Sequence, residues 1–353
     1  MTQPIAALQT ALAPHEAMLV EYGASRQYLT GFASSDGAVV ITPQDAVFLV
    51  DFRYIEKARA TVTACRVEQT VNPMEQLAAA IGGCDTLYVE PSHMSLQRHA
   101  ALTRALEGIT VSADDRMQRE LVALRQRKSS RELAAIRAAQ ALTDDTFSYI
   151  LERIEAGRTE REIMLDMEFY MRAHGSEGIA FDTIVVAGRH SSMPHGVPTD
   201  TPVAHGDFVT MDFGAVVDGY RADMTRTVAV GSVTDEMRAV YDTVLAAQTA
   251  ALAVIRPDAV CREIDAVARQ LIDDAGYRGR FGHGLGHGVG LEIHESPAFN
   301  MRCDTPLAVG MVMTVEPGIY LDGRFGVRIE DMVAVTPDGC ENLTHSEKGL
   351  IIL

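Results

Sequence analysis

Apolar and polar positions alternate along the first 120 residues in short blocks that predict a mixed α/β domain. Four apolar blocks have the length and β-branched content of strands. They are 17–22, 37–42, 46–51 and 86–90. Pro43-Gln44-Asp45 separates the middle two blocks, which predicts a hairpin. The helical spacing of apolar residues over 53–60 and 95–106 predicts two helices beside these strands.

A charged segment, 124–132, separates this part from the remainder of the chain. Within it, Ser129 and Glu132 have the spacing of a capping box, which predicts that a long helix begins there and continues to about residue 155. Thr159 and Glu162 have the same spacing and predict the start of a second helix. We therefore expect two domains, 1–124 and 125–353.

The second part is rich in predicted strands and has few helices. Tight turns join its strands in pairs, and two helices, about 234–254 and 260–275, lie between the pairs. The expected strands are 181–187, 207–216, 220–230, 311–320 and 326–335. This order predicts a mostly antiparallel α+β domain and not the regular strand–helix alternation of a doubly wound parallel sheet.

Composition and charge narrow the functional classes. Hydrophobic residues make up 47% of the 353 residues, as in ordinary globular proteins. The net charge of −17 argues against partners that need a basic surface, so we expect neither nucleic acid nor an anionic membrane. No signal peptide or membrane span is apparent. The five cysteines are scattered and form no Cys-x-x-Cys pair, which favours reduced thiols in a cytoplasmic protein.

Three aspartates occur in the predicted strands around TMDFGAVVDGYRADMTRT, although strands are usually poor in Asp. Asp218-Gly219 is a strong two-residue hairpin turn. The turn sets a register in which Asp212 faces Thr225, so that Asp212 and Asp223 are diagonal neighbours on one face. Two carboxylates on a covered face repel each other, which predicts a buried cation or a shared proton.

Two glutamates and one of three histidines could complete a metal site. Glu316 and Glu330 each interrupt an apolar strand pattern, and the glycine-rich segment 282–297 contains His283, His287 and His294. The alternating glycines argue against a helical His-x-x-x-His zinc site and indicate close approach of backbones. Two Asp, two Glu and one His suit manganese, iron or cobalt as well as zinc, and their number is sufficient for two ions.

These residues occur in motifs that resemble the M24-type "pita-bread" metallopeptidases, which include methionine aminopeptidase, aminopeptidase P and prolidase. Four blocks carry the resemblance over the whole second domain. They are PHG at 194–196, MDFGAVVDGYRADMTRT at 211–227, GHGLGHGVGLEIHE at 282–295, and TVEPGIY with GVRIED at 314–320 and 326–331. YLTGF at 28–32 and VDFRYIEKA at 50–58 resemble the creatinase-type N-terminal domain of the Xaa-Pro peptidase branch.

The resemblance implies a fold and a role for each matching residue. The fold would be a C-terminal pita-bread domain preceded by a smaller α/β domain. Asp212, Asp223, His287, Glu316 and Glu330 would bind two divalent ions, manganese in the first place and otherwise cobalt, zinc or iron. Glu316 would also be the general acid–base. His195, His283 and His294 would contact the substrate, with His195 and His294 also catalytic, and Thr225 and Arg328 would support the ligands.

The function implied is hydrolysis of Xaa-Pro bonds in short proline-containing peptides. Our first hypothesis is an Xaa-Pro dipeptidase, with Xaa-Pro aminopeptidase as the alternative and a metal-free peptide-binding or amidinohydrolase relative as a remoter one. A dipeptidase needs a cation for the free carboxylate of its product, and Arg302 resembles an arginine in that role, although a solvated loop arginine fits equally. A homodimer is the usual state of the family.

Overall fold

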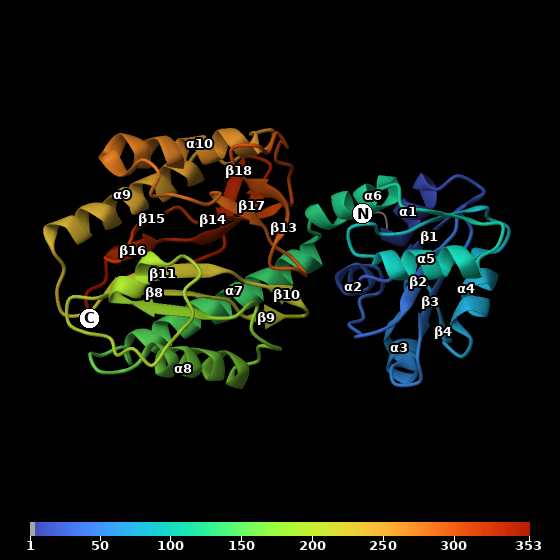
Figure 1. Cartoon of the computed structure of the whole chain (residues 1–353), viewed down its shortest axis with the longest axis horizontal. Helices are drawn as coiled ribbons and strands as arrows, with labels where there is room; N and C mark the ends of the chain where they lie inside the picture. Colours follow the sequence, from blue (N-terminus) through green and yellow to red (C-terminus); the bar gives the residue numbers. More distant parts are fainter. Residues whose placement is uncertain (1–3) are drawn as a thin grey trace. The chain divides into compact units, whose positions relative to one another are not determined.

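The computed structural model describes residues 4–353, and its internal contacts separate a unit that ends at Arg125 from a unit Gln126–Leu353. Figure 1 shows the first unit in blue to green and the second in green to red. The division lies next to the boundary that the charged segment indicates.

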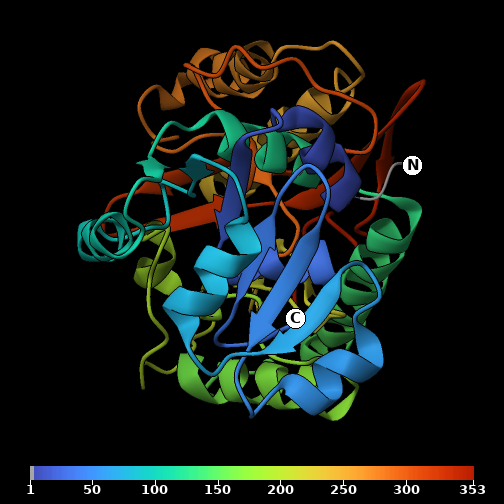
Figure 2. The same cartoon turned by 90° about the vertical axis from the view of Figure 1, so that its right-hand side faces the viewer.

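The N-terminal unit is a six-stranded mixed sheet with the strand order β4-β3-β2-β1-β5-β6. The predicted hairpin is confirmed as the antiparallel pair β2–β3, whereas β3–β4, β1–β5 and β5–β6 are parallel. The blue strands lie side by side in Figure 2. The strands are β1 (Glu16–Val20), β2 (Ala38–Ile41), β3 (Ala46–Val50), β4 (Arg66–Gln69), β5 (Thr86–Tyr88) and β6 (Thr110–Ser112). The helices are α1 (Pro4–Ala11), α2 (Gly23–Thr30), α3 (Ile55–Thr61), α4 (Pro73–Ile81), α5 (Leu96–Ala105) and α6 (Arg116–Gln126).

Both faces of this sheet are buried, because successive side chains of a strand point to opposite faces. Along β1, Met18 and Val20 belong to one apolar cluster with α1 and α6, and Ala17 and Leu19 belong to another with α4 and α5. Such strands are apolar at nearly every position, which explains why they are recognisable as continuous apolar runs.

The C-terminal unit contains four long helices and short antiparallel sheets. The helices are α7 (Ser130–Leu151), α8 (Glu160–Ala173), α9 (Asp235–Leu252) and α10 (Cys261–Ile272), with the short turns η1 (Gly188–Ser192) and η2 (Asp273–Tyr277). The first strands are β7 (Ile184–Ala187), β8 (Phe208–Phe213), β9 (Val216–Val217), β10 (Tyr220–Arg221) and β11 (Met224–Ala229). The later strands are β12 (Gly286–Gly288), β13 (Glu295–Phe299), β14 (Val312–Val315), β15 (Gly318–Leu321), β16 (Phe325–Arg328), β17 (Asp331–Thr336) and β18 (Gly339–Asn342).

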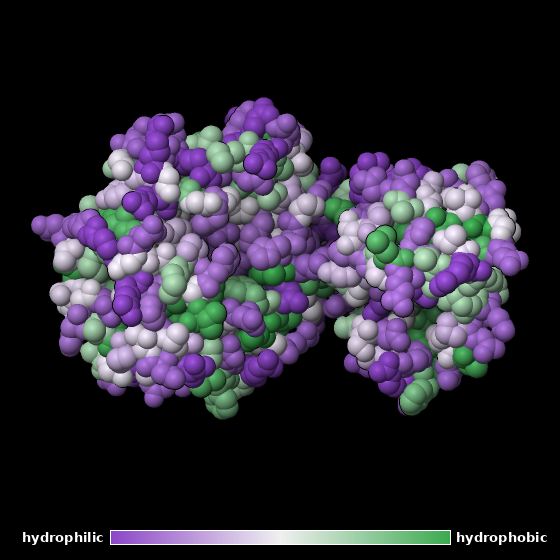
Figure 3. Space-filling view, viewed as in Figure 1, coloured by the Kyte–Doolittle hydropathy of each residue, from purple (hydrophilic) through white to green (hydrophobic). Residues whose placement is uncertain are grey.

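Two sheet–helix halves make up this unit. The sheet β11-β8-β7 packs on α7 and α8, and the sheet β13-β12-β14-β17-β18 packs on α9 and α10. In Figure 1, α8 is below the strands, and α9 and α10 are above them. On the face of the molecule shown in Figure 3, hydrophilic residues predominate and hydrophobic ones form small patches. The expected α+β architecture, with a smaller α/β unit before it, is confirmed.

Four strands that the sequence predicts as continuous are each divided in two, so these four predictions are wrong in this respect. They are 207–216, 220–230, 311–320 and 326–335. In three of them an acidic residue lies in the gap: Asp223, Glu316 or Glu330. The strands on either side of each gap belong to different sheets, so these carboxylates lie at the junctions between sheets. Apolar periodicity does not reveal the breaks at Glu316 and Glu330, because the strands on either side of them are buried along almost their whole length.

Candidate metal centre

The hairpin β8–β11 places the first two carboxylates. Asp218 has a φ of 51° and Gly219 has a φ of 78°, as the predicted turn requires at both positions. Asp212 lies directly opposite Thr225, so the predicted register is confirmed. Asp223 lies in the gap between β10 and β11 and is almost completely buried. A turn formed by local residue chemistry thus brings Asp212 and Asp223 to the same region of the unit.

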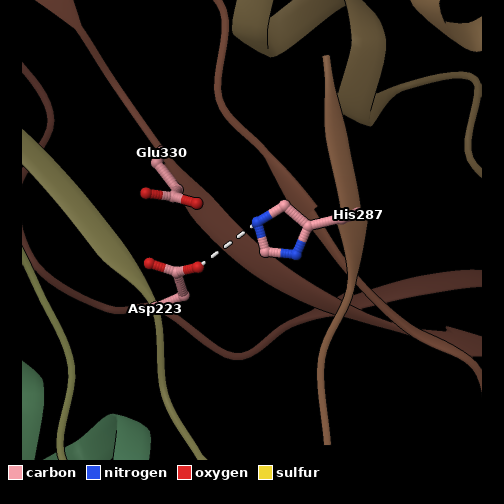
Figure 4. Close-up of side chains that lie close together, drawn as sticks. All are labelled: Asp223, His287 and Glu330. Carbon is pink, nitrogen blue, oxygen red and sulfur yellow. Dashed lines mark ion pairs between the residues drawn. The ribbon is translucent and has the colours of Figure 1, made fainter. Parts of the chain in front are cut away.

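Asp223, His287 and Glu330 form a cluster whose ligand atoms all lie within 4.8 Å of one another (Figure 4). Nε2 of His287 is 3.5 Å from Oδ2 of Asp223 and 3.4 Å from Oε1 of Glu316. Nδ1 of the same ring is 3.1 Å from the carbonyl oxygen of Gly288. If Nδ1–H donates to that carbonyl, Nε2 is left with a free lone pair directed at the carboxylates, which is the form that binds metals.

Asp212 has one oxygen bonded and one free. Its Oδ2 accepts a hydrogen bond of 2.7 Å from Nη2 of Arg328. Within residues 4–353, its buried Oδ1 has no hydrogen-bond partner. A buried carboxylate oxygen without a partner is costly, and a cation in the adjacent cluster would satisfy it. This oxygen therefore fits the donor set of a metal centre.

Thr225 and Arg328 orient the carboxylates. The Thr225 hydroxyl donates to Oε2 of Glu330 at 2.8 Å and accepts from Nε of Arg328 at 2.9 Å. Nη1 of Arg328 donates to the hydroxyl of Tyr320 at 3.0 Å and to the carbonyl of Pro194 at 3.2 Å. One buried guanidinium thus links Asp212, Thr225 and the loop that precedes His195.

Burial and mutual repulsion shift the pKa values of the clustered carboxyl groups upward. Burial raises the pKa of Glu316 to about 8, with the charge of Asp212 adding to the effect. Burial and neighbouring carboxylates also raise the pKa values of Asp223 and Glu330 well above their ordinary ranges. Burial lowers the pKa of His287 to about 4, which keeps its imidazole neutral. Carboxylates so close together retain their charges only beside a positive ion.

Glycines allow backbones to approach each other closely beside the cluster, as the sequence predicts. A Cβ on Gly286 would lie 2.0 Å from the carbonyl oxygen of Thr314, and one on Gly284 would lie 2.7 Å from that of Phe299. The close approach of Gly286 lets the Thr314 hydroxyl accept from the His287 backbone at 3.0 Å. The same hydroxyl lies 3.3 Å from Oε1 of Glu316. Thr314 therefore contacts both His287 and Glu316.

The cluster lies in the wall of a cavity of about 770 Å³ within the C-terminal unit. His195, His283 and His294 also line this cavity. The ring of His294 lies 4.4 Å from that of His287, and Nε2 of His283 is 2.9 Å from the Tyr320 hydroxyl. Burial lowers the pKa of His283 to about 4. Imidazoles in such a cavity can form hydrogen bonds with a bound substrate.

Arg302 is the predicted site residue that the structure places elsewhere. Its side chain is exposed, and Arg302 is absent from the residues that line the cavity. Sequence reasoning also missed Tyr320, whose hydroxyl bridges His283 and Arg328. Tyr320 follows the TVEP segment, where the sequence pattern marks it only as another strand residue.

Comparison with known proteins identifies this arrangement. The profile of "Metallopeptidase family M24" matches residues 134–337, and that of the "Creatinase/Prolidase N-terminal domain" matches residues 5–121. The chain belongs to metallopeptidase family M24. The family implies divalent metal ions, and the carboxylates and imidazole described above are suitable ligands for them.

Relatives within the family match almost the whole chain. An Xaa-Pro dipeptidase from Pyrococcus horikoshii is 34% identical over 95% of this chain and 94% of its own length. The structure of an Xaa-Pro dipeptidase from Bacillus anthracis superposes with a TM-score of 0.95, at 37% identity and 99% coverage of both chains. That of an X-Pro aminopeptidase from Thermotoga maritima superposes with a TM-score of 0.91, at 35% identity, over 98% of this chain and 99% of that one.

No helix within residues 4–353 has both the length and the apolar character that a membrane span requires.

Proposed function

We propose that this M24 peptidase hydrolyses Xaa-Pro bonds, with Xaa-Pro dipeptides as its first substrate class. The observation that carries the proposal is the convergence of Asp212, Asp223, His287, Glu316 and Glu330 in the wall of one cavity. Related chains named Xaa-Pro dipeptidase support it, since they are 34–42% identical to this one.

The five residues would hold two divalent ions, which supply a Lewis acid for the scissile carbonyl and an activated water. Glu316 would accept the proton of the attacking water and return it to the leaving nitrogen. His195 and His294 would donate hydrogen bonds to the carbonyl oxygen as negative charge develops on it.

A second candidate, an Xaa-Pro aminopeptidase that acts on longer peptides, is favoured by the chemistry of the cavity wall. Among the described residues that line the cavity, Arg328 is the only arginine or lysine. Its guanidinium is already bonded to Asp212, Thr225, Tyr320 and the Pro194 carbonyl. A free product carboxylate would have to be bound by histidines, whereas a longer peptide needs no cation at that position.

Hydrolysis of Ala-Pro, Ala-Pro-Ala and Ala-Ala by the Mn²⁺-loaded protein tests both candidates. A dipeptidase cleaves Ala-Pro with a higher kcat/KM than Ala-Pro-Ala, and a preference for the tripeptide identifies the aminopeptidase instead. Ala-Ala measures the requirement for proline. Equal cleavage of Ala-Ala and Ala-Pro would contradict the requirement for proline. No cleavage of either proline peptide would contradict the proposal and support the remoter peptide-binding or amidinohydrolase alternative.

Four finer statements belong to the same proposal. Manganese is the preferred ion, because the donor set is dominated by carboxylates. A homodimer is the expected assembly, which sedimentation of the purified protein would test. A cytoplasmic location is supported by five cysteines that are all free in the structure. Residues 1–124 form the creatinase-like domain and residues 125–353 the catalytic domain.

A further inference from the structure

A buried glutamate outside the metal centre has an unusually complete set of donors. Glu160 is the first residue of α8, and its side chain has no exposed surface. Its Oε1 accepts hydrogen bonds from the backbone N–H of Ala187 at 2.8 Å and from Nδ1 of His190 at 3.0 Å. Its Oε2 accepts from the backbone N–H of Thr199 at 2.9 Å and from the Thr199 hydroxyl at 2.7 Å.

These donors come from both ends of one loop. Ala187 ends β7, and the chain then passes through η1 and the PHG motif before it reaches Thr199. His195 lies between the two attachment points and lines the cavity. The start of α8 holds the end of the loop by backbone contacts too, since the N–H of Arg161 donates to the Thr199 carbonyl at 3.0 Å. Glu160 therefore closes the loop that carries His195.

The middle of the loop is also attached to β16 (Phe325–Arg328). The backbone N–H of Gly326 donates to the Ser191 hydroxyl at 2.9 Å, and Arg328 donates to the Pro194 carbonyl at 3.2 Å. His195 follows Pro194 directly, yet its own side chain is exposed. Its imidazole is thus placed by what holds the backbone on either side of it, and Glu160 holds both ends.

A carboxylate suits this position for a chemical reason. All four partners are donors, and an ionised carboxylate is an acceptor at both oxygens, whereas an amide presents an NH₂ group to two of them. Burying a charge is costly unless hydrogen bonds compensate for it, and the N-terminus of a helix favours a negative charge. The neighbouring Glu162 contrasts with it, because that side chain is exposed and, among residues 4–353, accepts hydrogen bonds only from Thr159.

We propose that Glu160 is a positioning residue, which holds the loop between Ala187 and Thr199 so that His195 is directed into the catalytic cavity. The catalytic part of this inference rests on the proposed peptidase function. The structural part does not, since the hydrogen bonds between Glu160 and the loop are independent of the substrate.

The test compares Glu160→Gln with Glu162→Gln, which changes a glutamate on the same helical turn. Hydrogen exchange of the metal-loaded proteins should show faster exchange in Glu160→Gln over peptides that cover 187–199, with β8 and β14 unchanged. Glu162→Gln should leave that loop at the wild-type rate, because it weakens only a local helix cap. Unchanged exchange of the loop in Glu160→Gln would overturn the proposal, and this readout needs no enzymatic activity.

Kinetics then test whether the effect passes through His195. Glu160→Gln should lower kcat/KM for the better Xaa-Pro peptide by about 10- to 100-fold, as for misplacement of a catalytic group. Glu162→Gln should stay within about twofold of the wild type, as expected when only part of a local cap is removed. In a His195→Ala background, Glu160→Gln should have almost no further effect, because the group that it positions is gone.

A loss of the same size in both backgrounds would mean that Glu160 acts elsewhere, and the proposal would fall. If the wild-type protein cleaves no Xaa-Pro peptide, the proposed function fails. The hydrogen-exchange comparison still tests whether Glu160 restrains the loop between Ala187 and Thr199.

Discussion

Gly286 and Thr314 lie in such close contact that a Cβ on Gly286 would be 2.0 Å from the Thr314 carbonyl oxygen. The neighbour is backbone, so no side-chain rotation can relieve the overlap. We predict that Gly286→Ala destabilises the metal-loaded protein by about 1–3 kcal/mol, as overpacking does, and weakens metal binding because it displaces His287. Urea unfolding and metal titration measure the two effects.

Gly282→Ala is the matched control for this substitution. A Cβ on Gly282 would meet no atom of the described residues within 4 Å. The control should have wild-type stability and metal affinity. If both alanine variants behave alike, the close approach of β12 and β14 does not determine the position of His287.

Arg328→Lys tests geometry at constant charge. The guanidinium makes bonds in four directions, to Asp212, Thr225, Tyr320 and Pro194. A lysine ammonium cannot reproduce this fork, so some buried partners lose their donor. We expect kcat/KM to fall at least about 100-fold, equivalent to about 2.7 kcal/mol, with a smaller change in metal content. Activity close to the wild type would show that the positive charge alone is sufficient.

The metal-free protein should lose stability as pH rises above neutrality. Glu316 has its pKa raised from 4.5 to about 8, so the folded state holds a proton that the unfolded state releases between these values. Asp223 and Glu330 shift in the same direction. The pKa of His287 is lowered from 6.5 to about 4, so this residue changes the free energy of unfolding only between these pH values. It does not contribute above neutrality.

Unfolding of chelated protein by urea between about pH 7 and 8.5 measures this dependence. The slope can reach about 1.4 kcal/mol per pH unit for each group that titrates fully. Glu316→Gln should reduce the slope, because the amide carries no titrating proton. With Mn²⁺ present the trend should reverse, since metal binds the deprotonated ligands. Stability that increases with pH in the chelated protein would contradict the assignment of the cluster.

Local chemistry explains which parts of the site could be predicted. The Asp218-Gly219 turn is formed by adjacent residues, so its register follows from the sequence alone. The divided strands do not. β14 and β17 join a five-stranded sheet with β12, β13 and β18, whereas β15 and β16 form a separate two-stranded sheet, and apolar periodicity does not show where the chain changes sheets. The carboxylates in these strands indicate a buried cation or a shared proton, and the family resemblance implies which residues are the ligands.

Glu160 shows why other contacts escape sequence analysis. It lies between Thr159 and Glu162, where acidic residues are expected simply because a helix begins there. Its partners are between 27 and 39 residues away, in a loop whose path no local pattern reveals. Arg302 illustrates the converse, since its spacing resembled that of a functional arginine while its side chain is exposed outside the cavity wall.

The central claim is that this chain is a peptidase whose cluster holds two metal ions. Calorimetric titration of chelated protein with Mn²⁺, followed by Ala-Pro and Ala-Pro-Ala hydrolysis at each addition, tests it most directly. We predict two equivalents bound per chain, with hydrolysis of a proline peptide appearing as the sites fill. Asp223→Asn should bind less metal and have no activity, because the amide lacks the carboxylate charge. Less than one equivalent bound by the wild-type protein, or full activity after chelation, would contradict the claim.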